Sequence, residues 1–232
     1  MKNIIELKNV CKKYAMGQVE VDALRGVNLE IKKGEFLAIV GPSGSGKSTM
    51  MNIVGCLDLP TGGEVFLDGK NIAHLRESEL ANARGKKIGF VFQQFNLMPT
   101  LSALDNTALP MEFQDVKIGD ARERAAELLG MVGLADRVHH LPSQLSGGQM
   151  QRVAIARALA TNPELILADE PTGNLDSKTG DFIIKFLREI HRKEKRTIVM
   201  VTHDIQLAKL ADRVAHIKDG KIERVERGTC AS

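Results

Sequence analysis

The stretch FLAIVGPSGSGKST, residues 36–49, decides the fold because it joins an unbroken apolar run to a glycine-rich loop. The apolar run 36–40 has no polar face, which is typical of a parallel strand buried between helices. The loop that follows has the spacing G-x-x-x-x-G-K-S and leads into a helical pattern, the context that a phosphate-binding loop requires. A glycine-rich turn with a chance lysine is the alternative, and the flanking strand and helix argue against it.

Each residue type in this loop suits phosphate chemistry. The glycines let the backbone wrap closely around phosphate oxygens with its N–H groups pointing inward. Lys47 supplies a point charge for the β- and γ-phosphates, the Ser48 hydroxyl can ligate Mg²⁺, and the Thr49 hydroxyl can lie near the α-phosphate. The residues expected to bind the nucleotide here are Gly41, Pro42, Ser43, Gly44, Ser45, Gly46, Lys47, Ser48 and Thr49.

Acidic residues follow a second buried run, in ELILADEP (164–171). We expect Asp169 to hold Mg²⁺ through water and Glu170 to lie beside the γ-phosphate. A carboxylate at that position can orient the attacking water or accept its proton. The two residues could instead merely begin a polar loop, but their pairing with a phosphate loop favours the functional interpretation.

Three further side chains are candidates for the same site. His203 follows the run 197–201, at a strand end where open α/β sheets bind their ligands, although a single histidine there is more often structural. Gln93, after IGFVF (88–92), could reach Mg²⁺ or the lytic water, and spacing alone does not separate it from Gln94. Tyr14 is the only tyrosine and could stack on adenine, with simple packing as the alternative.

The order of apolar runs predicts an α/β fold. Strands are expected at 4–10, 27–31, 36–40, 88–92, 165–169, 197–201 and 213–217, with a hairpin at 62–72. A long segment of helical character, including 119–134 and 149–160, separates the runs 88–92 and 165–169. The picture is a mainly parallel core, an N-terminal antiparallel β subdomain and an inserted α-helical subdomain.

Composition excludes several classes of protein. The 232 residues are 43% hydrophobic and 26% charged with a net charge of +3, and no basic tract argues for nucleic acid, so none is expected as a partner. Cys11, Cys56 and Cys230 are odd in number and lack C-x-x-C spacing, which predicts reduced thiols in a cytosolic protein. No apolar run is long enough to span a membrane, so another chain would have to carry this one there.

The stretch LPSQLSGGQMQRVAIARALA (141–160) looks like a second anion site. A Ser-Gly-Gly turn opens an amphipathic helix, and free N–H groups at a helix N-terminus attract phosphate. The chain already has a better phosphate loop at 41–49. The Ser-Gly-Gly turn and the start of its helix, which we call the second cradle, therefore need an explanation.

These pieces together resemble the ATP-binding cassette (ABC) family over nearly the whole chain. In order, the matching features are the aromatic residue Tyr14, the Walker A loop GPSGSGKST, the Q-loop glutamine, the signature LSGGQ, the Walker B run LILADE, the D-loop GNLD with Asp176 and the H-loop His203. In the family the Q-loop glutamine directly follows VF, which selects Gln93. No catalytic position departs from the pattern, and Glu170 is an intact glutamate.

The resemblance implies how the second cradle works. Two copies arranged head to tail would each offer the signature to the other's nucleotide, with Asp176 crossing the same interface. ATP and Mg²⁺ would be bound, with Ser48, Gln93 and Asp169 around the metal and Glu170, His203 and Gln93 in catalysis. The residues expected to act in the partner copy's site are Leu145, Ser146, Gly147, Gly148, Gln149 and Asp176.

A single domain spanning 1–232 is expected, with the core at 1–95 and 161–232 and the helical signature subdomain at 96–160.

The stretches 88–106, 141–159 and 169–180 resemble the lipoprotein-release and macrolide-export subgroup. That resemblance implies a homodimeric ATPase on the cytoplasmic face of the inner membrane. It would power a separate multi-span permease in export, lipoprotein release or periplasmic mechanotransmission.

Several alternatives remain open. Phe95, Leu97 and Met98 form either a groove for the permease or ordinary subdomain core. A soluble ABC ATPase acting on ribosomes or DNA is the main rival function, although this single cassette lacks tandem copies, coiled-coil insertions and basic arms. A P-loop kinase would leave the signature, D-loop and His203 unexplained.

Overall fold

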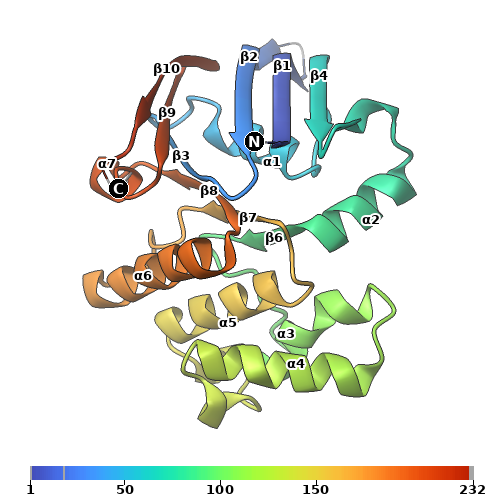
Figure 1. Cartoon of the computed structure of the whole chain (residues 1–232), viewed down its shortest axis with the longest axis vertical. Coiled ribbons are helices and arrows are strands. Elements are labelled where there is room, and N and C mark those ends of the chain that lie inside the picture. The colour runs from blue at the N-terminus through green and yellow to red at the C-terminus, as the bar shows by residue number, and fades with distance from the viewer. Residues whose placement is uncertain (1, 18, 230–232) are drawn as a thin grey trace. The chain divides into compact units, whose positions relative to one another are not determined.

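The apolar runs of the sequence become the strands of two contact units. The computed structural model describes residues 2–17 and 19–229, so Cys230 lies outside the described residues. One unit comprises Met1–Ala81 with His191–Ser232, and the other comprises Asn82–Ile190 (Figure 1). Helix α2 (Glu77–Lys87) begins in the first unit and ends in the second, and α6 (Ser177–Glu194) begins in the second and ends in the first.

An antiparallel sheet with the strand order β2-β1-β4-β5 forms part of the first unit. Its strands are β1 (Asn3–Met16), β2 (Val19–Lys32), β4 (Gly62–Leu67) and β5 (Lys70–Asn71). Tyr14 lies opposite Val21 in the β1–β2 register, and Ile5 lies opposite Leu67 in the β1–β4 register. The register shifts several times along β1 and β2, which are much longer than the runs 4–10 and 27–31 that predicted them.

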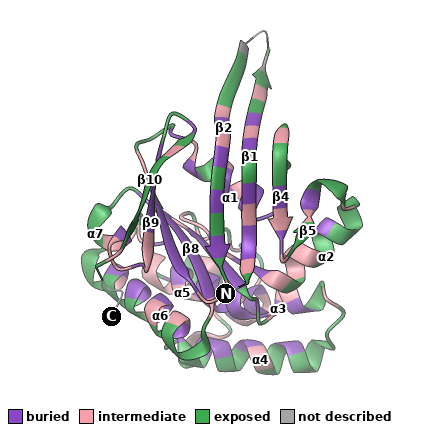
Figure 2. Ribbon diagram, turned by 45° about the horizontal axis from the view of Figure 1, so that its top comes forward, coloured by how far each residue is buried: buried purple, intermediate pink, exposed green. Residues whose placement is uncertain are grey.

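The second sheet of this unit has β3 (Phe36–Val40) between two parallel neighbours. These are β8 (Thr197–Thr202) and β9 (Arg213–Lys218), and β10 (Lys221–Arg227) pairs antiparallel to β9. Every residue of β3 and β8 is buried, as the absence of a polar face in both runs predicts. Figure 2 shows buried residues along β8, in the N-terminal half of β1 and in the C-terminal half of β2.

Short helices connect the strands of the first unit. Helix α1 (Lys47–Val54) follows β3 directly, a 3₁₀ turn η1 (Ile72–His74) follows β5, and α7 (Ile205–Ala208) follows β8. Helix α1 carries Met50, Ile53 and Val54 as buried residues, so it packs its apolar face into the core of this unit.

The second unit is mainly helical around one parallel strand pair. Strand β6 (Ile88–Val91) pairs with β7 (Leu165–Asp169), with Ile88 opposite Leu165. Between them in the chain lie α3 (Ala103–Glu112), α4 (Ile118–Met131), the turns η2 (Ala135–Arg137) and η3 (Pro142–Gln144), and α5 (Gly147–Leu159). Helix α5 packs against α3, α4 and β6, and it buries Val153, Ala154, Ile155 and Ala156.

These observations confirm the predicted fold class. The N-terminal sheet is antiparallel, β3 has parallel partners on both sides, and the helical segment is inserted between β6 and β7. Within residues 2–17 and 19–229, none of the helices combines the length and the apolar character that crossing a bilayer demands.

Candidate functional site

The loop 41–49 lies between the buried end of β3 and the first turn of α1. Gly46 occupies the N-cap position of α1 with φ 100°, a left-handed conformation that a side chain rarely adopts. Among the described residues, no side chain caps this helix, and the buried Ser45 hydroxyl has no hydrogen-bond partner. The loop therefore presents backbone N–H groups and a buried hydroxyl at the positive end of a helix dipole.

Lys47 stabilises the shape of this loop. Its side chain is buried, and Nζ donates to the carbonyl oxygens of Gly41 and Pro42, each at 2.8 Å. Ser45 O in turn accepts a 3.0 Å hydrogen bond from Gly220 N, in the turn between β9 and β10. The loop is thus fixed by bonds within it and by one bond from the β9–β10 turn, which preorganises it for an anion.

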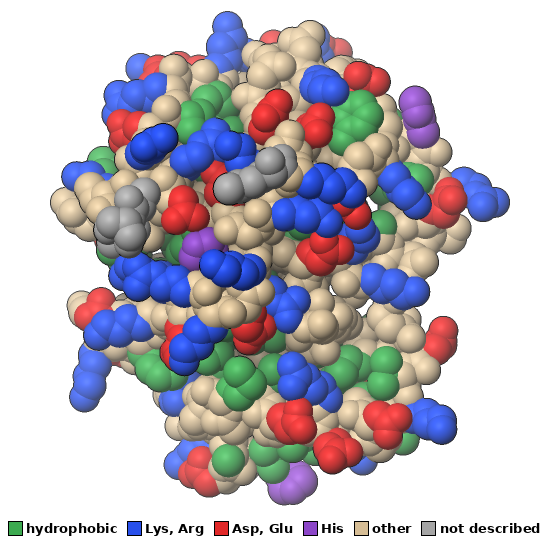
Figure 3. Space-filling model, viewed as in Figure 1, with side chains coloured by type: hydrophobic (Ala, Val, Ile, Leu, Met, Phe, Trp, Pro, Cys, Tyr) green, Lys and Arg blue, Asp and Glu red, His purple; other side chains and the backbone are tan. Residues whose placement is uncertain are grey.

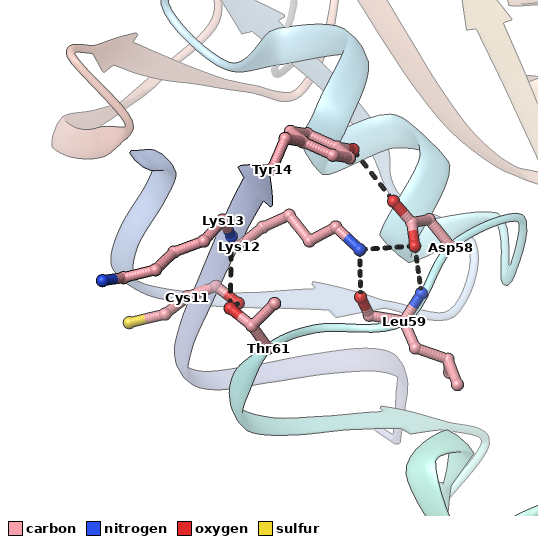
Figure 4. A network of polar contacts seen from close by, with 7 residues as sticks. All are labelled: Cys11, Lys12, Lys13, Tyr14, Asp58, Leu59 and Thr61. Carbon is pink, nitrogen blue, oxygen red and sulfur yellow. Dashed lines mark hydrogen bonds and ion pairs between the residues drawn. The ribbon is translucent and has the colours of Figure 1, made fainter. Parts of the chain in front are cut away.

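Tyr14 lies next to Thr49, the last residue of this loop, and Figure 4 shows its hydroxyl directed at Asp58. Its hydroxyl donates to Asp58 Oδ2 at 2.9 Å, and its side chain also hydrogen-bonds Thr49 on α1. Burial raises the pKa of Tyr14, the Asp58 hydrogen bond raises it further, and the Thr49 hydrogen bond opposes both. The structure therefore connects the predicted aromatic residue to the predicted phosphate loop through Thr49.

Asp58 also pairs with Lys12, whose Nζ lies 2.6 Å from Oδ1. Burial acts to raise the pKa of Asp58, but the hydrogen bonds from Lys12, Tyr14 and the Leu59 amide outweigh it and hold this pKa below its usual value. Asp58 is thus charged near neutral pH and is held by three donors.

His203 follows β8 and is exposed. Val40 and Thr202 are register partners in the parallel β3–β8 pair, so His203 and Gly41 leave the sheet at the same edge. Asp204 caps the N-terminus of α7 through Gln206 N and Leu207 N. The first unit therefore brings the phosphate loop and His203 to the carboxyl ends of neighbouring strands, the expected ligand edge of such a sheet.

The second unit carries the acidic candidates. Asp169 ends β7, and Glu170 has φ 42°, a left-handed conformation that is uncommon outside glycine. Glu170 O accepts from Gly173 N at 3.0 Å, and Pro171 O accepts from the buried Gln151 Nε2 at 2.7 Å. The turn that presents the Glu170 carboxylate is therefore fixed by its own backbone and by the signature helix α5.

Gln93 lies in this same network. It follows β6, whose parallel partner β7 ends at Asp169, so the two strand ends meet. The side-chain amide of Asn174 donates to Gln93 O at 3.0 Å. The backbone of Gln93 is thereby tied to the segment that follows Glu170.

The signature residues form the start of α5. Ser146 is the N-cap in a capping box: its Oγ accepts from Gln149 N at 3.3 Å, and Gln149 Oε1 accepts from Ser146 N at 2.8 Å. The backbone N–H groups of Gly147 and Gly148 are not part of this capping box. Leu145 is buried below the turn.

Asp176 begins the next helix of the unit. Its two carboxylate oxygens accept from Thr179, with 3.0 Å to the amide nitrogen and 2.6 Å to the hydroxyl. The same Thr179 methyl faces Gly148, where an added Cβ would collide with it. The start of the signature helix therefore packs directly against the segment that carries Asp176.

Four residues that stabilise this geometry are not identified as site residues by the sequence: Lys12, Asp58, Gln151 and Arg157. Arg157, half-buried on α5, donates to Phe95 O at 2.8 Å and to Asn96 O at 2.5 Å. Phe95 and Asn96 both have positive φ, at 59° and 50°. The sequence does carry one signal of this contact, because Arg157 is a charged residue within the otherwise apolar run VAIARALA.

Charges of both signs are mixed over the face shown in Figure 3, where Lys and Arg side chains lie among Asp and Glu side chains. This distribution produces no extended field of one sign on that face. Exposed apolar side chains of the second unit include Met98, Phe113, Val116, Ile118, Met131 and Leu141.

Comparison with known proteins shows which family this chain matches. A sequence model of the family described as ABC transporter matches residues 24–173. An uncharacterized ABC transporter ATP-binding protein of Thermotoga maritima is 52% identical over 227 residues, which cover 98% of this chain and 97% of that protein.

Two further relatives carry more informative names. The ATP-binding cassette MJ0796 of Methanocaldococcus jannaschii, in a dimeric post-hydrolysis structure bound to ADP and Pi, matches with a TM-score of 0.90 and 53% identity over 96% of this chain and 98% of that one. A macrolide export ATP-binding/permease protein, MacB, of Syntrophobacter fumaroxidans is 48% identical over 223 residues, which cover 95% of this chain and 31% of that protein.

Proposed function

Because this chain belongs to the ABC transporter family and is an ATPase cassette of that family, we propose that it is the subunit that powers a separate membrane permease. The name of the MacB relative joins an ATP-binding and a permease function in one protein, and this chain matches 31% of its length. The relatives from Thermotoga maritima and Methanocaldococcus jannaschii, which this chain covers to 97% of their length, are named ATP-binding proteins; these names support a permease on another chain, at the cytoplasmic face of the cell membrane. The macrolide-export name supports export as the direction.

We assign the nucleotide to the loop 41–49 and Tyr14. Within the described part of the chain, no side chain caps the N-terminus of α1 and the buried Ser45 hydroxyl has no partner, so both offer donors suited to phosphate oxygens. Lys47 adds a positive charge for the terminal phosphates. Tyr14 offers an aromatic face to the adenine ring.

The oxygen groups of Ser48, Gln93 and Asp169 fit Mg²⁺, a hard cation that prefers oxygen ligands. When bound, the metal neutralises charge on the β- and γ-phosphates. Glu170 orients the attacking water and accepts its proton, while His203 donates a hydrogen bond to the γ-phosphate.

We infer that the second cradle serves a second copy of the chain. In a two-fold dimer one surface supplies both sites, so residues 145–149 and Asp176 of each copy would meet the other copy's ATP. Hydrogen bonds to a charged phosphate contribute about 1.5–3 kcal/mol each, enough to offset an association cost of several kcal/mol. The dimeric ADP- and Pi-bound structure of MJ0796 supports this arrangement. Departure of the cleaved phosphate removes what these donors hold, so the dimer reopens after hydrolysis.

The observation that carries this proposal is the turn of Glu170, fixed between β7 and the signature helix. Replacing Glu170 with Gln keeps the shape and removes the base. We expect ATP binding to persist, hydrolysis to fall by about 100-fold or more, and the variant to elute as a dimer with ATP on gel filtration. Glu127→Gln, on α4 beside Arg124, is the matched control and should behave as wild type. A Glu170→Gln variant that stays monomeric at saturating ATP and high protein concentration would contradict the dimer mechanism.

A further inference from the structure

Lys12 is a charged residue that the fold buries. Its side chain on β1 is 11% exposed, and Nζ contacts Asp58 Oδ1 at 2.6 Å and Leu59 O at 2.8 Å. Burying an ammonium group is unfavourable unless the group is paired and hydrogen-bonded. Such a pair is weak support for stability, so its placement calls for another explanation.

The pair encloses Tyr14 from two directions (Figure 4). Lys12 Nζ lies 5.0 Å from the centroid of the Tyr14 ring, within the range of a cation–π contact. Asp58 Oδ2 accepts the hydrogen bond of the Tyr14 hydroxyl. One carboxylate therefore holds both the hydroxyl of the ring and the cation that lies over its face.

The segment that carries Asp58 is itself fixed to β1. Thr61 N donates to Cys11 O at 2.9 Å, the Thr61 hydroxyl donates to the same oxygen at 3.2 Å, and Lys13 N donates to Thr61 Oγ1 at 3.2 Å. The Leu59 amide donates to Asp58 Oδ1 at 2.8 Å. These bonds fix the carboxylate relative to the strand from which Tyr14 projects.

We propose that Lys12 and Asp58 are positioning residues that hold the Tyr14 ring with one face covered by Lys12 and the other face presented to the purine base of the nucleotide. This inference rests on the proposed function, in which Tyr14 stacks on adenine. Tyr14 is half-buried and Lys12 is buried over one face of its ring, which leaves the opposite face as the one to offer to a base. A ring held in its binding orientation loses less conformational freedom when the base stacks on it.

The chain offers a spectroscopic probe, because Tyr14 is the only tyrosine and there is no tryptophan. In Asp58→Asn the phenol loses a charged acceptor, so near-ultraviolet titration should show the pKa of Tyr14 falling towards its ordinary value. Steady-state ATP hydrolysis should show KM rising about 3- to 10-fold, with kcat within about twofold of wild type. Glu20→Gln is the matched control, since Glu20 pairs with Lys13 on the exposed side of the same strands and should leave both readouts unchanged.

Inorganic tripolyphosphate separates positioning of the base from damage to the phosphate loop. By calorimetry, Asp58→Asn should bind ATP about 3- to 10-fold more weakly and tripolyphosphate as wild type does. Lys12→Met, which keeps the apolar stem, should give the same pattern. The double variant Tyr14→Phe with Asp58→Asn should be no weaker than Asp58→Asn alone, because the two changes remove one interaction.

Equal losses of ATP and tripolyphosphate affinity would overturn the inference, and so would an unchanged KM alongside a shifted phenol titration. If Asp58→Asn does not fold, Lys12→Met and Tyr14→Phe decide by the comparison of ATP affinity with tripolyphosphate affinity. Wild-type protein that binds tripolyphosphate but hydrolyses no ATP would instead contradict the proposed function. The two failures are therefore distinguishable.

Discussion

The side-chain amide of Gln151 donates a 2.7 Å hydrogen bond to the carbonyl oxygen of Pro171, and the Gln151 side chain is fully buried. Gln151 lies in the signature helix, and Pro171 directly follows Glu170 with its left-handed backbone. This bond therefore couples the segment that we assign to the partner's nucleotide with the turn of Glu170, which we propose as the base of the chain's own site.

Replacing Gln151 with Leu should weaken this turn. The Pro171 carbonyl would be left buried without its donor, which costs about 1–3 kcal/mol of unfolding free energy. We expect kcat to fall about tenfold with a nearly unchanged KM, because the Glu170 carboxylate loses its fixed direction. Urea denaturation and steady-state kinetics measure the two effects. Gln144→Leu, at an exposed glutamine, is the control; a Gln151→Leu protein with wild-type kcat would contradict the coupling.

Gly148 should not tolerate a side chain. An alanine Cβ would collide with the Thr179 methyl group, so Gly148→Ala should lower the unfolding free energy by about 1–3 kcal/mol and reduce ATPase activity. Changing Thr179 to Ser in the same protein removes that methyl and keeps the hydroxyl that bonds Asp176. Thermal and urea unfolding should show recovery in the double variant. If Thr179→Ser restores nothing, the steric explanation is wrong.

The stability contributed by Asp176 should depend on pH. The side-chain and backbone hydrogen bonds from Thr179 hold the pKa of Asp176 below its usual value. A folded-state pKa below the unfolded value stabilises the protein above the unfolded pKa, and this contribution disappears as pH falls through the folded pKa. Thr179→Val should therefore raise the Asp176 pKa in carboxyl NMR titrations. Its stability deficit in urea denaturation should be largest near pH 7 and shrink below about pH 4; a deficit independent of pH would rule out this origin.

Ser146 tests whether the signature acts on another copy. Ser146→Arg places a bulky cation where we expect the partner's nucleotide, so hydrolysis should fall by about 100-fold or more while ATP affinity of the monomer stays near normal. Ser146→Ala removes only the helix cap and separates the cost of capping, about 0.5–2 kcal/mol, from the effect on the interface. Calorimetry on dilute protein and ATPase assays give the two values. Loss of monomer binding in Ser146→Arg would mean that the signature serves its own phosphate loop.

The strands and the helical insertion were predictable because each signal is local. The run 36–40 corresponds residue for residue to β3, and 165–169 to β7, since a strand buried on both faces requires an unbroken apolar run. Strand β10 was missed because its sequence KIERVER is charged and almost entirely exposed, so it lacks that pattern. Edge strands of this kind depend on backbone pairing more than on their side chains.

The supports of the site were not predictable for a different reason. Lys12 and Asp58 are separated by 46 residues, and Gln151 and Pro171 by 20, so each contact exists only once strands and helices are placed. Glu170 likewise has a left-handed backbone although it is neither glycine nor asparagine, so its residue type does not predict that conformation. Motifs identify the groups expected to touch the nucleotide, whereas the groups that hold those residues are set by tertiary structure.

Lys47 has a consequence for the design of inactive variants. Its ammonium group donates to the carbonyl oxygens of Gly41 and Pro42, so Lys47→Ala would remove these internal hydrogen bonds together with the charge that we assign to phosphate binding. Weak ATP binding by such a protein would mix a lost contact with a misshapen loop. An inactive reference for transport experiments is better made at Glu170, where the loop is left whole.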